Sequence, residues 1–244
     1  MVRTVVGWAL FVLSTVILGV VAILLSLVDS SGNLPHRVAR IWGKIQLRSA
    51  GSPVSISGLE NIDRHQSYIL VSNHQSTFDI FALLGYLPIQ FRWIAKAELF
   101  RIPFLGWAMT RIGYIPIERD SPKKAYRSML AAAEAVKRGV SVIIFPEGTR
   151  SPDGKLQPFK KGLFLIALKS QAPILPITIQ GTAAIMTKGD WRTRPGRVWI
   201  TVGRPIETAG IPPEREADLS RQVRETVEKN LSRGTAAGAR GVSP

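Results

Sequence analysis

The sequence contains no cysteine and only three histidines among its 244 residues. Without thiols the chain can form neither a disulfide nor a thiolate metal site, and so few histidines argue against a zinc site. Covalent catalysis lacks its usual nucleophiles as well, because cysteine is absent and no G-x-S-x-G serine motif occurs. The sequence therefore predicts chemistry that needs no metal, no bound cofactor and no covalent enzyme intermediate.

Acidic residues are scarce. Asp and Glu number 17 against 32 Lys and Arg, which gives a formal net charge of +15. Such an excess favours an anionic partner, which is a nucleic acid, a lipid headgroup surface or an acidic protein. The basic residues are spread along the chain and no nucleic-acid-binding motif occurs, so we expect no nucleic acid.

Residues 5–28 form a long apolar segment, with no charge in 24 positions. As a helix it would extend about 36 Å, enough to cross a hydrocarbon core of roughly 30 Å. No small-residue cleavage site follows, so we interpret the segment as an uncleaved anchor rather than a signal peptide. Four small or hydroxyl-bearing residues leave open whether it crosses the membrane or lies in its interface: Gly7, Ser14, Thr15 and Gly19.

More cations follow this segment than precede it. Only Arg3 comes before it, whereas four cations lie just after it: Arg37, Arg40, Lys44 and Arg48. The positive-inside tendency places the rest of the chain on the cytoplasmic face, so we expect the inner membrane. The same cations alternate with apolar residues over 34–48, which predicts a basic amphipathic helix on anionic lipid. The alternative is a solvated linker helix.

The remainder has the pattern of an α/β domain with a mixed sheet flanked by helices. We expect strands at 54–56, 68–72, 91–95, 113–117, 141–145, 174–179 and 198–202, and helices at 78–86, 104–112, 122–138, 162–170 and 214–231. The predicted organisation is a membrane anchor at 1–50, a catalytic domain at 51–232 and a disordered tail at 233–244.

A polar cluster containing His74 and Asp79 joins the strand at 68–72 to the helix at 78–86. On one continuous helix the two residues would lie roughly 140° apart, so they can pair only if His74 is on the preceding loop. In that arrangement the carboxylate fixes the imidazole tautomer and creates a general base. The alternative is a structural histidine whose hydrogen bonds are satisfied.

A second polar cluster, 145–151, follows the strand at 141–145. Its glycine allows a tight turn close to a ligand, and Arg150 offers a planar donor suited to phosphate. The cluster predicts an anion-binding loop, with a turn closed by a Glu147–Arg150 salt bridge as the alternative. Lys96 and Arg119 are further cations near strand ends, where either could equally be a surface charge.

Four blocks in this order and spacing resemble the HX4D glycerolipid acyltransferases. His74 with Asp79 is similar to the HX4D motif, and 145–151 is similar to the FPEGTRS block. Residues 113–119 resemble a block that ends in arginine, and 174–177 resemble a block with proline in an apolar strand. Within the family the chain is most similar to the bacterial 1-acyl-sn-glycerol-3-phosphate acyltransferases.

The resemblance covers about 68–178 and implies a role for each residue. His74 would deprotonate the 2-hydroxyl of lysophosphatidic acid, with Asp79 orienting it, and the product would be phosphatidic acid. Lys96 is a candidate for stabilising the thioester oxyanion. Glu147 would orient Arg150 or a hydroxyl rather than touch the phosphate. The phosphate-binding side would comprise Arg119, Glu147, Gly148, Thr149 and Arg150.

The donor implied by the resemblance is acyl-coenzyme A or acyl carrier protein, between which the sequence does not choose. Close rivals acylate glycerol 3-phosphate, another lysophospholipid or an aminolipid, because specificity depends on pocket shape. The rival of another class is a basic, membrane-anchored binding module without catalytic activity.

Overall fold

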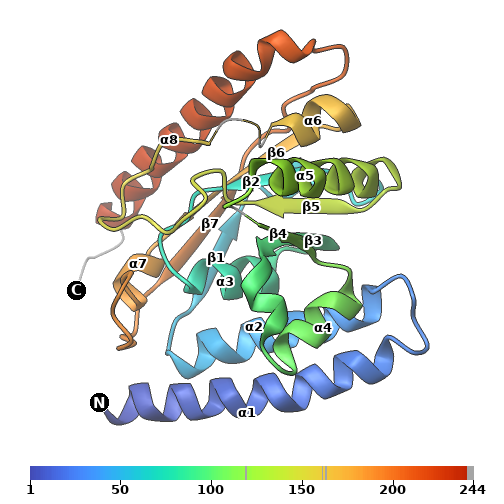
Figure 1. Cartoon of the computed structure of the whole chain (residues 1–244). Helices are drawn as coiled ribbons and strands as arrows, with labels where there is room; N and C mark the ends of the chain where they lie inside the picture. Colours follow the sequence, from blue (N-terminus) through green and yellow to red (C-terminus); the bar gives the residue numbers. More distant parts are fainter. Residues whose placement is uncertain (119, 161, 163, 241–244) are drawn as a thin grey trace.

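A computed structural model describes residues 1–118, 120–160, 162 and 164–240 (Figure 1). In this part of the chain, seven strands form one sheet in the order β1-β7-β6-β2-β5-β3-β4. Neighbouring strands are parallel except β6 and β7, which are antiparallel, so the sheet is mixed as predicted. The strands are β1 (Val54–Ser57), β2 (Ile69–Ser72), β3 (Phe91–Lys96), β4 (Ile115–Ile117), β5 (Ser141–Ile144), β6 (Ile174–Gln180) and β7 (Val198–Val202).

Helices cover both faces of the sheet, which explains why β2 and β5 are buried at every position and apolar except at Ser72 and Ser141. On one face, α3 (Phe78–Tyr86) and α4 (Leu105–Ile112) pack beneath the strands (Figure 1). On the other face lie α5 (Pro122–Lys137), α6 (Leu165–Ser170) and α8 (Glu216–Arg240). Short helical segments complete the described chain: η1 (Leu59–Asn61), η2 (Ala97–Arg101), α7 (Thr182–Ile185) and η3 (Pro213–Arg215).

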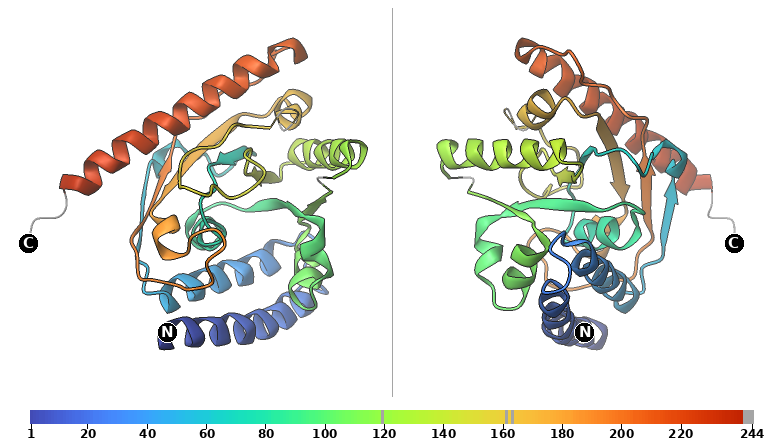
Figure 2. Two further views of the ribbon diagram at one scale, coloured as in Figure 1. Left: turned by 60° about the vertical axis from the view of Figure 1, so that its left-hand side comes forward. Right: turned by 90° about the vertical axis from the view of Figure 1, so that its right-hand side faces the viewer.

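The N-terminal helices α1 (Val2–Leu25) and α2 (Asn33–Ser49) form an outer layer below α3 and α4 (Figures 1 and 2). Both were predicted, although α1 begins earlier than expected. Gly43 allows α2 to approach α3 closely, since a Cβ at this position would lie 2.7 Å from the Phe81 carbonyl oxygen. The layer therefore packs on the domain instead of extending away from it.

Two features differ from the sequence expectations. The helix expected to end at 231 continues to Arg240, while the disordered tail at 233–244 stays a prediction. The added residues lack the apolar periodicity on which the expected boundary rested. Residues 241–244 lie outside the described residues. Helix α7 was not predicted, because four residues are too few to give a periodic signal.

Candidate active site

His74 lies at the carboxyl end of β2, on a loop that is fixed to the neighbouring strand. The Asn73 side-chain amide donates to the Ile179 carbonyl at 2.9 Å and accepts from the Ile179 amide at 2.8 Å, which anchors the loop to β6. The chain then enters α3, so Asp79 comes in the first turn of that helix. His74 Nδ1 lies 2.8 Å from Asp79 Oδ2, which is the pairing that the sequence predicted.

The Asp79 carboxylate is fully buried but well supplied with hydrogen bonds. Its Oδ2 atom also accepts from the backbone amides of Gln75, at 2.6 Å, and Ser76, at 2.8 Å. A carboxylate oxygen can only accept, so the His74 ring donates through Nδ1 and keeps its acceptor lone pair on Nε2. This tautomer is the one a general base requires.

Aromatic packing fixes the plane of the His74 ring. Phe145 stacks on it with ring centroids 3.9 Å apart and an angle of 7° between the planes. Trp93 packs against Phe145 in turn, at 5.4 Å. The His74 side chain is 12% exposed, so the base is held in one orientation and mostly away from bulk water.

Glu147 does not orient Arg150 or a hydroxyl, contrary to the expectation. Its Oε1 atom accepts from the His74 backbone amide at 2.6 Å, and Oε2 accepts from the Gln157 amide at 2.8 Å. Sequence spacing could not reveal this, because both partners are backbone groups. Burial raises the pKa of Glu147 to about 7, outweighing the two amide hydrogen bonds, which lower it. Glu147 thus ties the loop at 145–151 to the backbone of the base.

Arg150 lies beside the base and forms no salt bridge with any described carboxylate. Its Nη1 atom donates to Thr77 Oγ1 at 2.9 Å, which holds the guanidinium next to the start of α3. The alternative of a Glu147–Arg150 salt bridge is therefore wrong. Gly148 turns the loop with φ +71°, a conformation that suits glycine. The backbone conformation thus places Thr149 and Arg150 on the same side as His74.

Lys188 also belongs to this cluster, although the sequence analysis missed it. Its ammonium donates to the Arg150 carbonyl at 2.9 Å and to Thr149 Oγ1 at 3.3 Å. A single lysine nearly 40 positions from the loop carries no local sequence signal. Lys96 lies at the end of β3, pairs with Glu98 at 2.8 Å and is half exposed. The remaining predicted cation, Arg119, lies outside the described residues.

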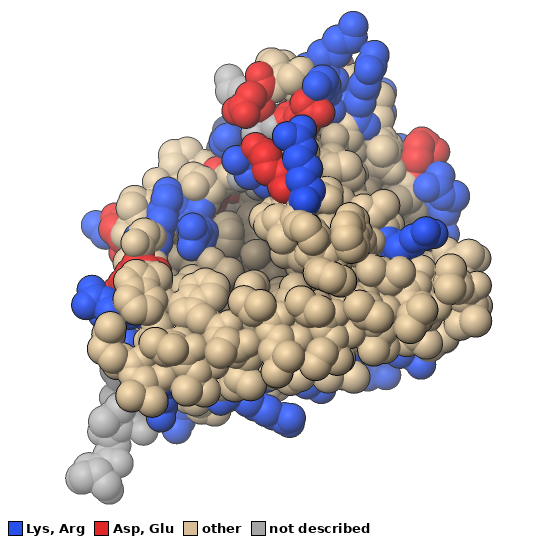
Figure 3. Space-filling view, turned by 60° about the horizontal axis from the view of Figure 1, so that its bottom comes forward, with Lys and Arg blue, Asp and Glu red and all other residues tan. Residues whose placement is uncertain are grey.

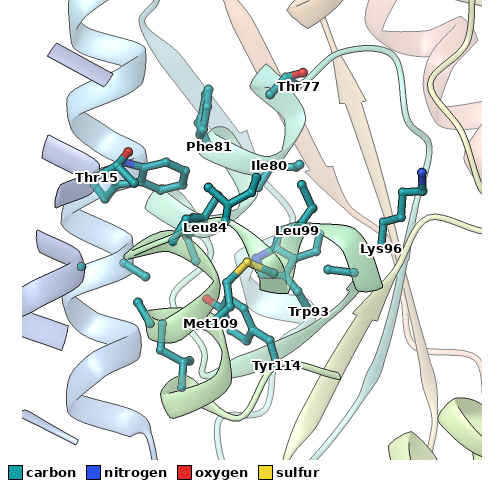
Figure 4. A pocket seen from close by; sticks show the side chains of 18 of the residues that line it. Thr15, Thr77, Ile80, Phe81, Leu84, Trp93, Lys96, Leu99, Met109 and Tyr114 are labelled. Carbon is teal, nitrogen blue, oxygen red and sulfur yellow. The ribbon is translucent and has the colours of Figure 1, made fainter. Parts of the chain in front are cut away.

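An apolar cavity of about 670 Å³ extends from this cluster toward the N-terminal helices. His74, Thr77, Lys96 and Arg150 lie on its lining, while Gly19 and other residues of α1 line it as well. Figure 4 shows apolar side chains from α3, β3 and α4 directed into it, including Leu84, Trp93 and Met109. A space of this size and character suits a flexible hydrocarbon chain. Within the described residues no group of three His, Asp or Glu side chains gathers to hold a metal ion.

Several known proteins are similar to this chain in sequence. A family model described as Acyltransferase matches residues 53–180. The chloroplastic 1-acyl-sn-glycerol-3-phosphate acyltransferase BAT2 of Brassica napus is 41% identical over 173 residues, which are 70% of this chain and 50% of the relative. The 1-acyl-sn-glycerol-3-phosphate acyltransferase of Pseudomonas aeruginosa is 34% identical over 185 residues, which are 75% of this chain and 70% of the relative. The chain spans about half the length of the Brassica relative.

A solved structure extends the similarity beyond the four sequence blocks. The crystal structure of the 1-acyl-sn-glycerophosphate (LPA) acyltransferase PlsC from Thermotoga maritima matches with a TM-score of 0.84 and 32% identity. The match covers 96% of this chain and 95% of that one, so it includes the N-terminal helices as well as the α/β domain. The family model, the relatives and the shared fold show that the chain belongs to the acyltransferase family.

Proposed function

We propose that the protein transfers an acyl group from an acyl thioester to the 2-hydroxyl of 1-acyl-sn-glycerol 3-phosphate. The observation that carries the proposal is a His74–Asp79 pair at the polar end of an apolar cavity, beside an arginine that pairs with no carboxylate among the described residues. The three features match the three parts of the reaction, which are a hydroxyl to activate, an acyl chain to hold and a phosphate to bind.

The reaction needs one base and no covalent enzyme intermediate. His74 Nε2 accepts the proton of the lipid hydroxyl while the oxygen attacks the thioester carbonyl carbon. The new C–O bond forms, the C–S bond breaks, and the proton on His74 passes to the leaving thiolate. Asp79 stabilises the imidazolium between these steps. General-base help of this kind contributes roughly a factor of 10² to 10⁴ in rate.

The acceptor's phosphate binds on the Arg150 side of the site. The guanidinium supplies a charged two-point donor, and Thr149 supplies a hydroxyl beside it. Gly148 allows the loop backbone to approach the ligand, and Arg119 is a further candidate from the sequence. Lys96 lines the same cavity, where its ammonium is a candidate for stabilising the negative charge on the thioester oxygen. Glu147 contributes by holding the base and not by touching the phosphate.

The cavity holds the acyl chain of the donor, which is acyl-coenzyme A or acyl carrier protein. Its apolar lining continues from the base into the layer formed by α1 and α2. The reacting carbonyl therefore lies at the polar end beside His74, and the far end of the acyl chain lies among apolar side chains. The protein requires no metal or resident cofactor in this scheme. The strongly basic composition suits the phosphates of coenzyme A and equally an acidic carrier protein.

The membrane is the source of the lipid acceptor, and the α1–α2 layer is the surface that contacts it. Helix α1 is the described helix that is long and apolar enough to cross a membrane. Figure 3 shows the face formed by this layer as a broad area without charged side chains, with Lys and Arg at its margins. Apolar surface bordered by cations suits the interface of an anionic bilayer. We place the catalytic domain on the cytoplasmic face of the inner membrane.

Acyl transfer by the detergent-purified protein tests these assignments. Labelled acyl-coenzyme A and acyl carrier protein are supplied separately, with lysophosphatidic acid as the acceptor. We expect His74→Ala to abolish phosphatidic acid formation and Arg150→Ala to raise the KM for the acceptor. His65→Ala and Arg138→Ala are matched controls, because both residues are exposed. A fully active His74→Ala protein would refute the mechanism. Transfer only to glycerol 3-phosphate or to another lysolipid would show that the proposed acceptor is wrong.

A further inference from the structure

The two oxygens of Asp79 have very different surroundings. Oδ2 accepts three hydrogen bonds, from His74 Nδ1 and from the amides of Gln75 and Ser76. Oδ1 accepts a hydrogen bond from the hydroxyl of Thr182, a residue 103 positions away in the chain. Thr182 is fully buried and is the first residue of α7. The carboxylate that holds the base is therefore itself held from the far side.

We propose that Thr182 is a positioning residue of the active site, the third member of a chain His74–Asp79–Thr182. The terminal torsion of an aspartate is broad, and rotation about it moves both carboxylate oxygens together. A donor on Oδ1 therefore adds a restraint on the far side of the carboxylate and narrows the range of orientations, which keeps Oδ2 directed at Nδ1. Threonine suits the task because its β-branched side chain is stiff and its hydroxyl hydrogen can turn to the acceptor. This inference rests on the proposed function.

Helix α7 is well fixed for this role. Gly181 precedes it with φ +89°, and a Cβ there would lie 2.0 Å from the Arg197 carbonyl oxygen, so the turn into α7 requires glycine. After the helix, the Met186 carbonyl accepts from the Ser76 hydroxyl at 2.6 Å. Both ends of α7 thus contact the segment that carries the base. A catalytic group gains precision when its neighbours are themselves locked in this way.

The variants Thr182→Val and Thr182→Ser separate the hydroxyl from the shape of the side chain. Thr182→Val keeps the branched shape and removes the donor, so we expect kcat to fall roughly 10- to 100-fold with little change in KM. Thr182→Ser keeps the donor and should restore most of the activity. Thr208→Val is the matched control, because Thr208 is a buried threonine whose hydroxyl donates to the Ala172 carbonyl at 2.8 Å, outside the active site. That control should lose stability and keep kcat.

A double-mutant cycle with Asp79→Asn distinguishes positioning from general damage. If Thr182 acts through the carboxylate, Thr182→Val should cost little further activity once Asp79 is an amide. Equal losses in both backgrounds, or a wild-type kcat for Thr182→Val, would overturn the proposal. So would a failure of Thr182→Ser to restore activity lost by Thr182→Val.

Nitrogen-15 NMR of histidine-labelled protein supplies a readout that needs no turnover. The chain contains three histidines, so the His74 resonances can be assigned with the His74→Ala protein. We expect the Nδ1–H proton signal of His74 in the wild type and in Thr182→Ser, but an altered or exchange-broadened signal in Thr182→Val. If wild type shows no acyl transfer yet this pattern holds, the proposed function fails and the positioning role stands. An unchanged signal in Thr182→Val refutes the positioning role whatever the activity.

Discussion

Replacing Glu147 with glutamine should remove a pH dependence of stability that burial creates. The folded protein raises the pKa of this carboxyl to about 7, above its ordinary value of 4.5. Well below pH 4.5 the carboxyl is protonated in both the folded and the unfolded state, so it does not make the free energy of unfolding depend on pH. Between the two values the folded state binds more protons, so the free energy of unfolding decreases as the pH rises. Above pH 7 the carboxylate is ionised in both states, and the full loss in the free energy of unfolding is present.

The size of the effect follows from the separation of the two values. The pKa of Glu147 differs by about 2.5 between the unfolded and folded states, which corresponds to about 3 kcal/mol in the free energy of unfolding, since a pKa difference of 1 is worth about 1.4 kcal/mol. Glu147 is only 3% exposed, so solvent screening reduces this figure little. For a chain of 244 residues, about 3 kcal/mol corresponds to a change of roughly 6 to 12 °C in the midpoint of thermal unfolding.

The assay compares thermal unfolding of wild type and Glu147→Gln in one detergent at pH 5 and pH 8. Glutamine cannot accept from both backbone amides, so the variant should be less stable than wild type at pH 5. The informative quantity is the difference between the two proteins, in which the titration of all other groups cancels. We expect wild type to lose its advantage as the pH rises. Glu216→Gln is the control, since that carboxylate also accepts a backbone amide but is partly exposed. A difference independent of pH would contradict the reasoning.

Three further predictions concern packing around the site. Gly43→Val should lower the free energy of unfolding by about 1 to 3 kcal/mol, because the new Cβ meets the Phe81 carbonyl oxygen; thermal unfolding measures this. Phe145→Leu should lower kcat about tenfold with little change in stability, since the stacked partner of His74 is lost; an unchanged kcat would show that Asp79 alone orients the ring. Ala108→Phe should fill part of the cavity and reduce kcat/KM more for long-chain than for short-chain donors.

Much of the site could be predicted because its chemistry is local in the sequence. His74 and Asp79 are five residues apart on a strand-to-helix junction, where the order of secondary structure fixes their geometry. Arg150 follows a buried strand, and parallel strands end at one edge of the sheet. The sequence therefore predicted both halves of the site and the edge where they meet.

The remaining features depend on contacts that no local pattern encodes. Thr182 reaches Asp79 across 103 positions, and Glu147 binds backbone amides that are the same in every sequence. The cavity is lined from four separate α-helices, strand β3 and the loops beside them, so its size follows from packing. The continuation of α8 from 231 to Arg240 was not predicted because hydrophobic periodicity is absent there.

The orientation of α1 follows from its contacts with the rest of the protein. Trp8 near the start of the helix donates from its indole nitrogen to the Trp191 carbonyl at 2.9 Å. In the middle, Thr15 accepts from the Trp42 indole of α2 at 3.0 Å. Further along, a Cβ on Gly19 would lie 3.2 Å from the Phe104 carbonyl oxygen at the start of α4. The helix is therefore attached to the domain over most of its length.

A helix attached in this way cannot cross a bilayer without drawing α2 and the domain into the hydrocarbon. Helix α2 carries four cations, Arg37, Arg40, Lys44 and Arg48, each of which would cost about 2.5 kcal/mol or more at the membrane centre. An orientation along the interface keeps them near anionic headgroups and still buries the outward apolar face of α1. Its exposed side chains include Val5, Val12, Leu13, Ile17 and Leu24. We therefore expect α1 to lie in the plane of one leaflet.

Single cysteines at the start of α1 and just beyond its end test this expectation without background, because the sequence contains no cysteine. Val2 and Val28 are both 79% exposed, so Val2→Cys and Val28→Cys should perturb the fold little. A membrane-impermeant maleimide is added to sealed, right-side-out spheroplasts and then to opened ones. If α1 lies in one leaflet on the cytoplasmic side, neither cysteine reacts until the membrane is opened. If α1 crosses, one end reacts in sealed spheroplasts while the other does not, and the in-plane orientation is wrong.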